Sequence, residues 1–355
     1  MRDLPAVPGI LTAAQCRRTA ESIAAEQESG GAIPWFTGGH TDPWDHIESA
    51  MALTAAGLLS EARAAYEWSA RTQRPDGSWP LQFRGGAVEN ADTDTNFCAY
   101  IATGVWHHYR RTGDRSFAES MWPTVRAAID YVATMQQGRN GEIYWLRSAS
   151  GVIPEALLTG CSSMFHSIRC ALALAELVGD PQPDWEVAAL RLGHALRHHP
   201  ESFAEKNRYS MDWYYPVLCG AYRGADGAER IDSRWGDFVV GRIGIRCVAD
   251  RPWVTGAETC ELALALDTLG DHRRARELLG SMQHLRENDG SYWTGLVFAD
   301  GKRWPEERTT WTGAAMILAA DALSNATAAA GIFRDAAAPI DITAGFACDC
   351  IGSRR

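Results

Sequence analysis

The chain has 355 residues, and its 34 basic and 44 acidic side chains leave a formal net charge of -10. That length suits one large domain or two ordinary ones, and a hydrophobic content of 46% is enough for a packed core. Phosphate binding needs a clustered basic surface, so the acidic balance argues against a nucleic-acid partner. Tryptophan, with 14 residues, is the unusual feature of the composition.

The sequence also disfavours membrane proteins and disulfide-rich proteins. No apolar run approaches the roughly 18 residues of a membrane span, and the first residues lack a secretory signal pattern. The nine cysteines are odd in number, scattered and without a C-x-x-C spacing. We therefore expect a cytoplasmic protein with no membrane partner, no bound metal and no cofactor, and its oligomeric state stays open.

Helical patterns follow one another along almost the whole chain. Apolar residues recur at i, i+3, i+4 and i+7, most clearly over residues 98–109, 117–135, 161–178 and 258–269. Such runs end at a glycine, and a new run begins a few residues later, at Gly57, Gly113, Gly179, Gly224 and Gly270. These glycines predict tight helix-to-helix turns.

Six longer connections alternate with the tight turns, roughly over residues 28–46, 74–94, 137–160, 198–212, 243–257 and 287–310. Helices joined alternately by short and long connections form hairpins whose long connections emerge at one end. This order predicts an all-α fold, an (α/α)6 barrel of six helical hairpins, as a single domain over residues 1–330. The Ala-rich tail, residues 331–355, loses the periodicity and is expected to pack loosely.

A weak internal repeat supports this order of helices. The segment Gln73-Arg74-Pro75-Asp76-Gly77-Ser78-Trp79 recurs as residues 286–293, and a degenerate copy runs from Gln137 to Trp145. Each copy follows an expected outer helix. Each is a turn signal closed by an aromatic residue.

The long connections are rich in tryptophan. Seven of the 14 tryptophans lie inside them, and Trp213 and Trp311 lie one residue beyond. Flat apolar rings with a polar N–H suit the faces of sugars, although tryptophans could also simply plug the mouth of the barrel. The candidate substrate-binding residues are Trp35, Trp44, His46, Trp79, Asp92, Asp94, Asp212, Trp213, Trp253, Trp304 and Trp311.

Acidic residues stand at the expected starts of the inner helices. They are Asp45, Asp92, Asp94, Glu155, Asp212, Glu258 and Glu306. Glycoside hydrolysis needs two carboxyl groups, one protonated to donate to the leaving oxygen and one ionised. Acids also favour first turns of helices through capping and the helix dipole. Six connections that each combine an acid with aromatic rings favour a sugar site.

Parts of the chain resemble glucoamylase-type glycoside hydrolases. The similarity covers most of residues 42–325 and includes Asp42-Pro43-Trp44-Asp45, Asp76-Gly77-Ser78-Trp79 and Trp304-Pro305-Glu306-Glu307. It implies that Asp45 holds hydroxyls of the sugar beside the cleaved bond. It also implies that Glu155 is the general acid and that the base lies in the segment of Glu306.

Two segments resemble mycobacterial proteins often labelled prenyltransferase-like. They are Asp42-Pro43-Trp44-Asp45-His46-Ile47-Glu48 and Trp253-Val254-Thr255-Gly256-Ala257-Glu258-Thr259-Cys260-Glu261. One group of these proteins hydrolyses methylmannose polysaccharides, which are cytoplasmic α-1,4-linked, partly O-methylated mannans. This resemblance implies an endo-acting mannosidase, and methyl groups on the substrate would suit an aromatic-rich cleft.

The two resemblances differ about which acids react. This chain has Trp44 where the glucoamylase pattern has Arg, and it lacks the Trp expected before Glu155. We therefore predict Asp45 with Glu258 as the reacting pair, with Glu261 as a substitute for Glu258 and with Glu155 and Glu306 as the second pair. Inversion would place the reacting carboxyl groups about 6.5–9.5 Å apart.

Two other functions remain open at this point. A terpene cyclase or prenyltransferase-like enzyme acting on an isoprenoid also uses helical barrels, but the run Asp92-Thr93-Asp94-Thr95 lacks the final Asp of a protonating Asp-x-Asp-Asp motif. A non-catalytic carbohydrate-binding barrel would keep the aromatic rings and could lose any acid. The sugar, its linkage and the stereochemical outcome also stay open.

Overall fold

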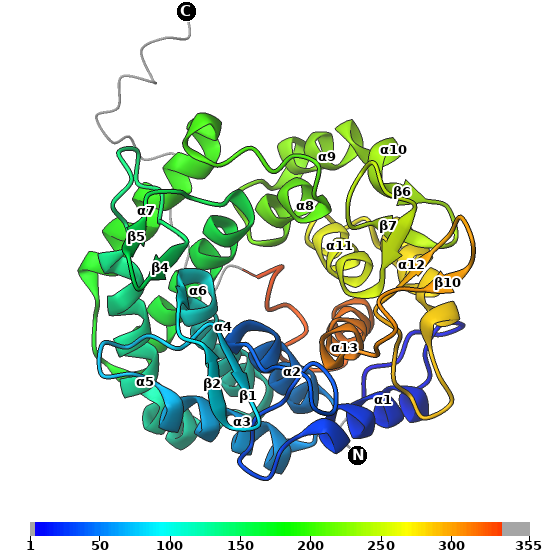
Figure 1. Cartoon of the computed structure of the whole chain (residues 1–355), viewed down its shortest axis with the longest axis horizontal. Helices are drawn as coiled ribbons and strands as arrows, with labels where there is room; N and C mark the ends of the chain where they lie inside the picture. Colours follow the sequence, from blue (N-terminus) through cyan, green and yellow to red (C-terminus); the bar gives the residue numbers. More distant parts are fainter. Residues whose placement is uncertain (1–3, 336–355) are drawn as a thin grey trace, which may run out of the picture.

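The computed structural model describes residues 4–335, and within them the main body is a closed ring of helices (Figure 1). The inner ring consists of α2 (Pro43–Ala55), α4 (Thr95–Thr112), α6 (Leu158–Val178), α8 (Ser210–Leu218), α11 (Gly256–Thr268) and α13 (Thr310–Ser324). Each inner helix contacts the next one, and α13 contacts α2.

A second layer of helices surrounds the inner ring (Figure 1). It consists of α1 (Ala13–Glu26), α3 (Leu59–Thr72), α5 (Arg115–Thr134), α7 (Pro183–His198), α9 (Gly224–Ser233) and α12 (His272–Ser281), with the short α10 (Trp235–Phe238) after α9. Outer and inner helices alternate along the chain, so the inner helices all start at the end that carries the long connections. The prediction of a helix-rich fold is confirmed.

Most of the tight turns end helices where the glycines predicted. Gly113 caps α4 and Gly179 caps α6, both in the left-handed conformation, with φ of 70° and 77°. Glycine adopts this conformation without the steric cost that a Cβ atom brings. Gly57 and Gly270 likewise follow the ends of α2 and α11. Gly224 is instead the first residue of α9, so this predicted stop is wrong.

The long connections contain short strands that the sequence did not predict. A hairpin pairs β1 (Gln82–Arg84) with β2 (Ala87–Asn90), and a second sheet orders β3 (Thr93–Asp94), β4 (Leu146–Ser148) and β5 (Gly151–Ile153). A third sheet contains β6 (Val239–Val240), β7 (Gly244–Arg246), β8 (Trp253–Thr255), β9 (Gly295–Val297) and β10 (Lys302–Arg303). The expectation of an all-α chain is therefore wrong for the connections, since antiparallel pairs tie neighbouring connections together.

The repeated turn joins one outer helix to the next. After α3, Gly77 has a φ of 88°, and a Cβ atom at this position would lie 2.0 Å from the carbonyl oxygen of Ala127 in α5. Gln73, at the end of α3, donates from Nε2 to the carbonyls of Gly77 and Thr124, both at 2.9 Å. Gly77 permits the turn to approach α5 closely, and Gln73 connects the turn to α5 through its two hydrogen bonds.

The same device recurs around the ring. Gln136 donates to the carbonyl of Gly141 (2.8 Å) and to α7, and Gln27 donates to the carbonyl of Gly31 (3.0 Å) and to α3. After η2 (Met282–Leu285), which follows α12, a Cβ on Gly290 would lie 2.6 Å from the backbone of α1. The weak sequence repeat therefore reflects a repeated contact between outer helices.

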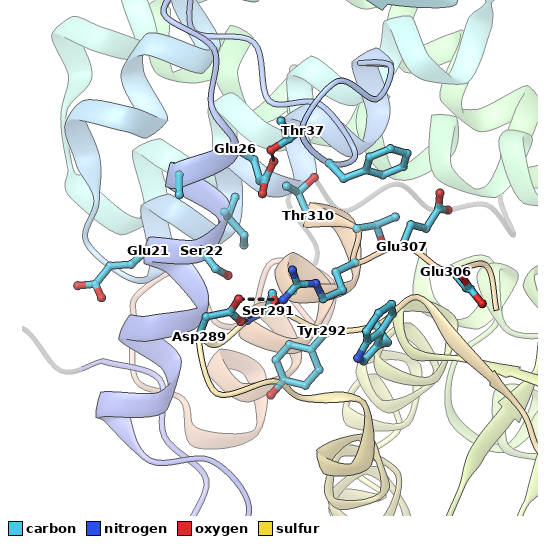
Figure 2. A pocket seen from close by; sticks show the side chains of 17 residues that line it. Glu21, Ser22, Glu26, Thr37, Asp289, Ser291, Tyr292, Glu306, Glu307 and Thr310 are labelled. Carbon is cyan, nitrogen blue, oxygen red and sulfur yellow. Dashed lines mark hydrogen bonds and ion pairs between the residues drawn. The ribbon is translucent and has the colours of Figure 1, made fainter. Parts of the chain in front are cut away.

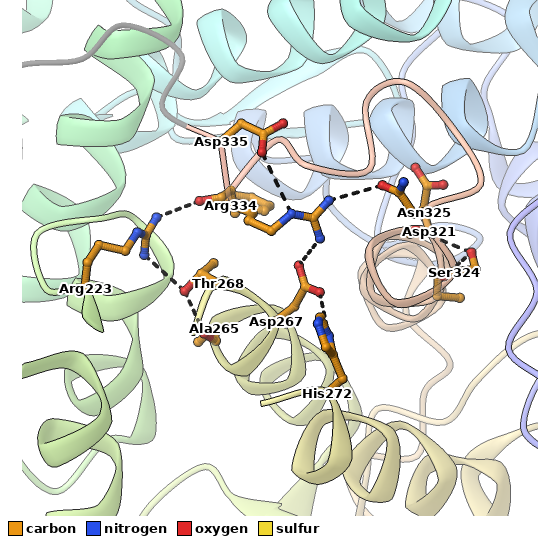
Figure 3. Close-up of polar contacts among 12 residues, drawn as sticks. Arg223, Ala265, Asp267, Thr268, His272, Asp321, Ser324, Asn325, Arg334 and Asp335 are labelled. Carbon is orange, nitrogen blue, oxygen red and sulfur yellow. Dashed lines mark hydrogen bonds and ion pairs between the residues drawn. The ribbon is translucent and has the colours of Figure 1, made fainter. Parts of the chain in front are cut away.

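The segment that follows α13 closes the end of the ring where the inner helices terminate (Figure 3). Arg334 pairs with Asp267 at the end of α11 (2.8 Å), and Arg223 donates from Nη2 to the carbonyl of Phe333 (2.6 Å). The Phe333 ring is buried, with its centroid 4.9 Å from that of His166 in α6. One end of the ring is thus covered by the chain itself.

This packing differs from the loose tail that we expected. Ile332 and Phe333 are 4% and 7% exposed and belong to the hydrophobic core. Residues 331–335 are therefore packed, and the rest of the predicted tail, residues 336–355, lies outside the described residues.

The inner helix α6 is long and apolar enough to cross a membrane, the one such helix in the described residues. Its most apolar window is 83% buried inside the protein. Burial of this kind is what a core helix shows, because the surrounding helices cover its apolar surface.

Candidate active site

Two inner helices each carry a pair of acids at their N-terminal ends. Asp45 and Glu48 lie on α2, and Glu258 and Glu261 lie on α11. Residues three apart lie on the same face of a helix, so each pair points in one direction. All four side chains are buried, with Asp45 8%, Glu48 2%, Glu258 5% and Glu261 2% exposed.

The four acids share one electrostatic site. Burial raises the pKa of Asp45 well above its usual range, and the charges of Asp42, Glu48, Glu261 and Glu258 raise it further. Burial and the charge of Glu261 likewise raise the pKa of Glu48. The structure therefore brings the predicted pair, Asp45 and Glu258, into one cluster from two helices that both pack against α13.

Hydrogen bonds distinguish these acids from one another. The hydroxyl of Tyr215 donates to Oε1 of Glu261 at 2.6 Å, and the hydroxyl of Tyr214 donates to Oε2. Burial raises the pKa of Glu261 to about 8, and these two donors lower it in part. Oε2 of Glu258 is buried and has no hydrogen-bond partner among residues 4–335. Burial also raises the pKa of Glu258, and the side chains of Thr255 and Cys247 lower it in part. Glu261 is therefore held through both of its oxygens, whereas Glu258 keeps Oε2 for another partner.

Asp45 owes its position to a capping residue. The carboxylate of Asp42 accepts hydrogen bonds from the backbone N–H groups of Trp44 and Asp45, both at 2.9 Å, and so starts α2. Nε1 of Trp35 donates to the same carboxylate at 2.7 Å. Trp35, which we predicted to contact the substrate, therefore orients the Asp42 carboxylate, and Asp42 in turn fixes the position of Asp45 at the start of α2.

Aromatic rings surround the acid cluster. The indole of Trp44 reaches across the ring from α2, with centroids 5.8 Å from Phe97, 5.7 Å from Tyr100 and 5.7 Å from Tyr215. Trp311, the second residue of α13, lies beside Glu48. Trp44 and Trp311 are both half-buried, so part of each ring faces solvent beside the cluster.

Several buried polar atoms in this region lack a partner within the described chain. They include Nε1 of Trp145 and both amide atoms of Asn96. Buried polar atoms in folded proteins are nearly always hydrogen-bonded, so such a concentration needs an explanation. A ligand rich in hydroxyl groups would supply the missing donors and acceptors.

Three predicted substrate contacts lie outside this cluster. His46 faces α3, where Nδ1 accepts from the backbone of Ile33 and Nε2 lies 3.0 Å from the carbonyl of Ala65. Trp79 donates to a carbonyl of α3, and Trp213 stacks on Phe238 beside α9. All three side chains are buried, and His46 and Trp79 support the packing against α3. Trp213 also lines a cavity of about 580 Å³, which Asp212 shares.

Other predicted residues lie in the connections around the cluster. Asp94 caps α4, and burial raises its pKa to about 7, with a contribution from the charge of Asp42. Asp212 accepts from the hydroxyl of Thr159 at 2.6 Å, so it links α8 to α6. Asp92 lies half-buried just before β3.

Two tryptophans that we predicted as substrate contacts are hydrogen-bonded to each other beside the third sheet. Nε1 of Trp253 donates to the carbonyl of Trp304 at 2.7 Å. Trp304 itself is 57% exposed, so its ring stays free on the surface of the long connections.

The second predicted acid pair, Glu155 and Glu306, lies in two other long connections. Glu155 is half-buried in the connection before α6, where its carbonyl accepts from the N–H of Trp145 (3.0 Å). Glu306 is exposed and lines a separate cavity of about 650 Å³ with Glu307 and residues of α1 (Figure 2). The structure links Asp45 electrostatically to Glu258, and Glu155 with Glu306 stays a predicted second pair.

Sequence reasoning missed Glu48 and the two tyrosines that hold Glu261. The signal for Glu48 was present, because Asp45 and Glu48 have the same spacing as Glu258 and Glu261. The tyrosines gave no such signal, since their role depends on the packing of α8 against α11.

The alternative isoprenoid functions find less support. The Asp94 carboxylate already accepts a hydrogen bond from the backbone of Phe97 (3.1 Å) as a helix cap. In the part of the chain that the structure describes, no group of three His, Cys, Asp or Glu side chains is arranged to hold a metal ion. The arrangement as a whole suits hydrolysis of a bond between sugars.

Comparison with known proteins identifies relatives. No protein-family model matches the chain. The chain is 65% identical over 352 residues to the MMP endo-(1,4)-3-O-methyl-alpha-D-mannosidase of Mycolicibacterium hassiacum, covering 99% of this chain and 98% of that protein. It is 24% identical over 138 residues to an uncharacterised glycosyl hydrolase of Methanocaldococcus jannaschii, covering 38% of this chain and 22% of that protein.

Solved structures share the fold. A glycosidase variant in complex with glucose has a TM-score of 0.69 at 16% identity, covering 88% of this chain and 96% of that chain. A D-mannose isomerase has a TM-score of 0.65 at 10% identity with the same coverage. At these identities the likeness concerns the fold alone. The near full-length relative goes further, and the chain belongs to the family of the M. hassiacum MMP endo-(1,4)-3-O-methyl-alpha-D-mannosidase.

Proposed function

We propose that this chain is a single-domain (α/α)6 barrel enzyme that hydrolyses α-1,4 bonds inside a 3-O-methylmannose polysaccharide. The observation that carries this proposal is the 65% identity, over nearly the whole chain, to an endo-mannosidase of that specificity. The buried acid cluster supports it, because glycoside hydrolysis uses two carboxyl groups and here two inner helices present them.

We assign Asp45 as the general acid and Glu258 as the general base. Burial and the neighbouring acids raise the pKa of Asp45, which favours its protonated form near neutral pH. Asp45 gives its proton to the glycosidic oxygen as the bond to the anomeric carbon breaks. Glu258 takes a proton from the water that attacks this carbon from the opposite face, so the product is inverted.

Glu261 and Glu48 take supporting places in this assignment. Both oxygens of Glu261 accept hydrogen bonds from tyrosine hydroxyls, so it positions those side chains and is not the base. Glu48 lies one turn below Asp45, and its charge adds to the field that raises the pKa of Asp45.

The aromatic rings fit a methylated mannan. Trp44 and Trp311 offer half-buried rings for the C–H faces and methyl groups of the sugar. We place the reaction in the cytoplasm, as the seven cysteines of the described residues, all free thiols, would suit a reducing compartment.

Incubation with three classes of substrate tests this function. Methylated mannan, unmethylated α-1,4-mannan oligosaccharides and isoprenoid diphosphates are each incubated with the enzyme, and products are followed by mass spectrometry and by proton NMR of the new reducing end. We expect internal cleavage of the methylated polymer with β-configured product formed first. Release of diphosphate would instead indicate the isoprenoid enzyme, and binding without cleavage would indicate a carbohydrate-binding barrel.

A further inference from the structure

A separate cavity of about 650 Å³ lies between α1 and the connection before α13 (Figure 2). One wall is the last part of α1, including Glu21 and Ser22, and the opposite wall runs from Asp289 to Arg308. Its volume is in the range of pockets that hold small ligands. The proposed reaction at Asp45 and Glu258 makes no use of it.

The cavity offers an aromatic surface. The ring of Trp293 is half-buried in its wall, and Nε1 donates to Glu287 at 2.6 Å, which holds the indole in place. The guanidinium of Arg308 lies 5.7 Å from the centre of this ring and is itself paired with Asp289 at 2.8 Å. Phe36 adds a second half-buried ring. The aromatic surface is therefore rigid before any ligand arrives.

Unpaired carboxylates complete the lining. No residue of the described chain forms a hydrogen bond or ion pair with the carboxylates of Glu21, Glu306 or Glu307. Glu307 is half-buried, and burial raises its pKa. An aromatic face beside free acceptors is the combination that recognises a neutral sugar, through ring stacking and hydrogen bonds from hydroxyl groups. The excess of acids over the single Arg308 disfavours an anionic ligand.

The cavity is near the end of the ring that carries the catalytic acids. Its walls include Phe36 and Thr37, from the connection that leads into α2, and Thr310, the first residue of α13. Thr310 ties these connections together, since its N–H donates to the carbonyl of Trp35 (2.8 Å) and its hydroxyl to that of Pro34 (2.8 Å). A polymer that leaves the acid cluster over this rim would meet the cavity.

We infer that this cavity is a second binding site for neutral mannan, which holds a part of the polysaccharide away from the bond being cleaved. The inference rests on the proposed endo-acting function. It predicts that polymer binding uses contacts that a short oligosaccharide does not reach.

The test compares a long methylated mannan with a short 3-O-methylmannose oligosaccharide. The variant Glu21→Gln/Glu307→Gln removes a free carboxylate from each wall while keeping side-chain shape. Asp184→Asn/Glu186→Gln, on the exposed start of α7, is the control for loss of two negative charges. We expect KM for the polymer to rise about tenfold in the cavity variant. kcat on both substrates and KM for the short oligosaccharide should stay at the wild-type values, as should all constants of the control.

A further variant and a binding measurement distinguish failure of this inference from failure of the proposed function. Ser22→Phe narrows the cavity without removing an acid, and it should raise KM for the polymer in the same way. Binding of the polymer to Asp45→Asn should change little between low and high salt, because a neutral sugar releases no ions. An unchanged polymer KM in both cavity variants, or equal losses on short and long substrates, would overturn the inference. Polymer binding that disappears at high salt would show that charge, and not ring stacking and neutral hydrogen bonds, holds the polymer, and it would overturn the inference too. A wild-type enzyme that cleaves neither the long nor the short substrate would instead refute the proposed function.

Discussion

At the scale of single residues, the four buried acids differ in the partners that hold them. Glu261 is fixed by Tyr214 and Tyr215, whereas Oε2 of Glu258 has no partner within residues 4–335. A carboxyl group that reacts must be free to exchange a proton with substrate or water. This difference supports Glu258 over Glu261 as the reacting acid of α11.

The raised pKa of Glu261 predicts how stability depends on pH. Its pKa is about 8 in the folded chain and about 4.5 when unperturbed, so the folded state binds more protons across this window. The free energy of unfolding should therefore fall as pH rises from 5 to 8. Glu261→Gln cannot ionise, and we expect it to reduce this fall by on the order of 2 kcal/mol.

Urea unfolding at several pH values measures this effect. The exposed Glu186→Gln is the control and should follow the wild-type slope. An unchanged slope in Glu261→Gln would mean that this carboxyl does not stay protonated in the folded protein.

The same scale shows which positions sequence reasoning could predict and which it could not. Asp45 and Glu258 were predicted because both stand in the first turn of an inner helix, a position that pattern and caps define. His46 was predicted wrongly as a substrate contact, because its neighbour Asp45 faces the ring while His46 faces α3. Adjacent residues on a helix point about 100° apart, so sequence proximity to an acid does not make a contact.

At the scale of elements, the turn after each outer helix determines how neighbouring hairpins pack. Gly77 allows the backbone of its turn to touch α5, and Gln73 bridges the same contact. Helices were predictable because their apolar period extends over many residues. The strands were not, because segments of two to four residues are too short for an alternating pattern to show.

Two glycine substitutions separate backbone conformation from packing. Gly57 and Gly77 both have positive φ, 80° and 88°, but a Cβ on Gly57 meets nothing within 4 Å whereas one on Gly77 lies 2.0 Å from Ala127. We expect Gly57→Ala to cost about 1–2 kcal/mol of stability, and Gly77→Ala at least about 2 kcal/mol more. Thermal unfolding measures both, and equal losses would show that the turn does not pack against α5 as described.

At the scale of the whole molecule, the two ends of the ring have different roles. The segment after α13 covers one end, through Phe333 and Arg334 (Figure 3). The other end carries the acid cluster and the neighbouring cavity (Figure 2). The covered end stabilises the ring, and the open end is left for substrate. Stability and catalysis should therefore respond to different substitutions.

Phe333→Ala tests this separation. The ring is 7% exposed and packs against His166, so its loss should cost about 3–5 kcal/mol. kcat, measured well below the unfolding temperature, should stay at the wild-type value, because the acids lie at the opposite end. Val187→Ala, at a 48% exposed position on α7, is the control and should change stability by less than about 0.5 kcal/mol. A lower kcat in Phe333→Ala, measured where the variant is fully folded, would contradict the idea that the two ends of the ring serve stability and catalysis separately.

The most direct test of Asp45 and Glu258 as the reacting pair is the chain-length distribution of a methylated mannan over time, followed by mass spectrometry. The wild-type enzyme should produce internal fragments. Asp45→Asn and Glu258→Gln should bind the polymer but cleave it about 10²–10⁴-fold more slowly. Glu155→Gln should cleave at the wild-type rate. Cleavage at the wild-type rate by Asp45→Asn or by Glu258→Gln would contradict the assignment. Loss of cleavage in Glu155→Gln alone would contradict it as well.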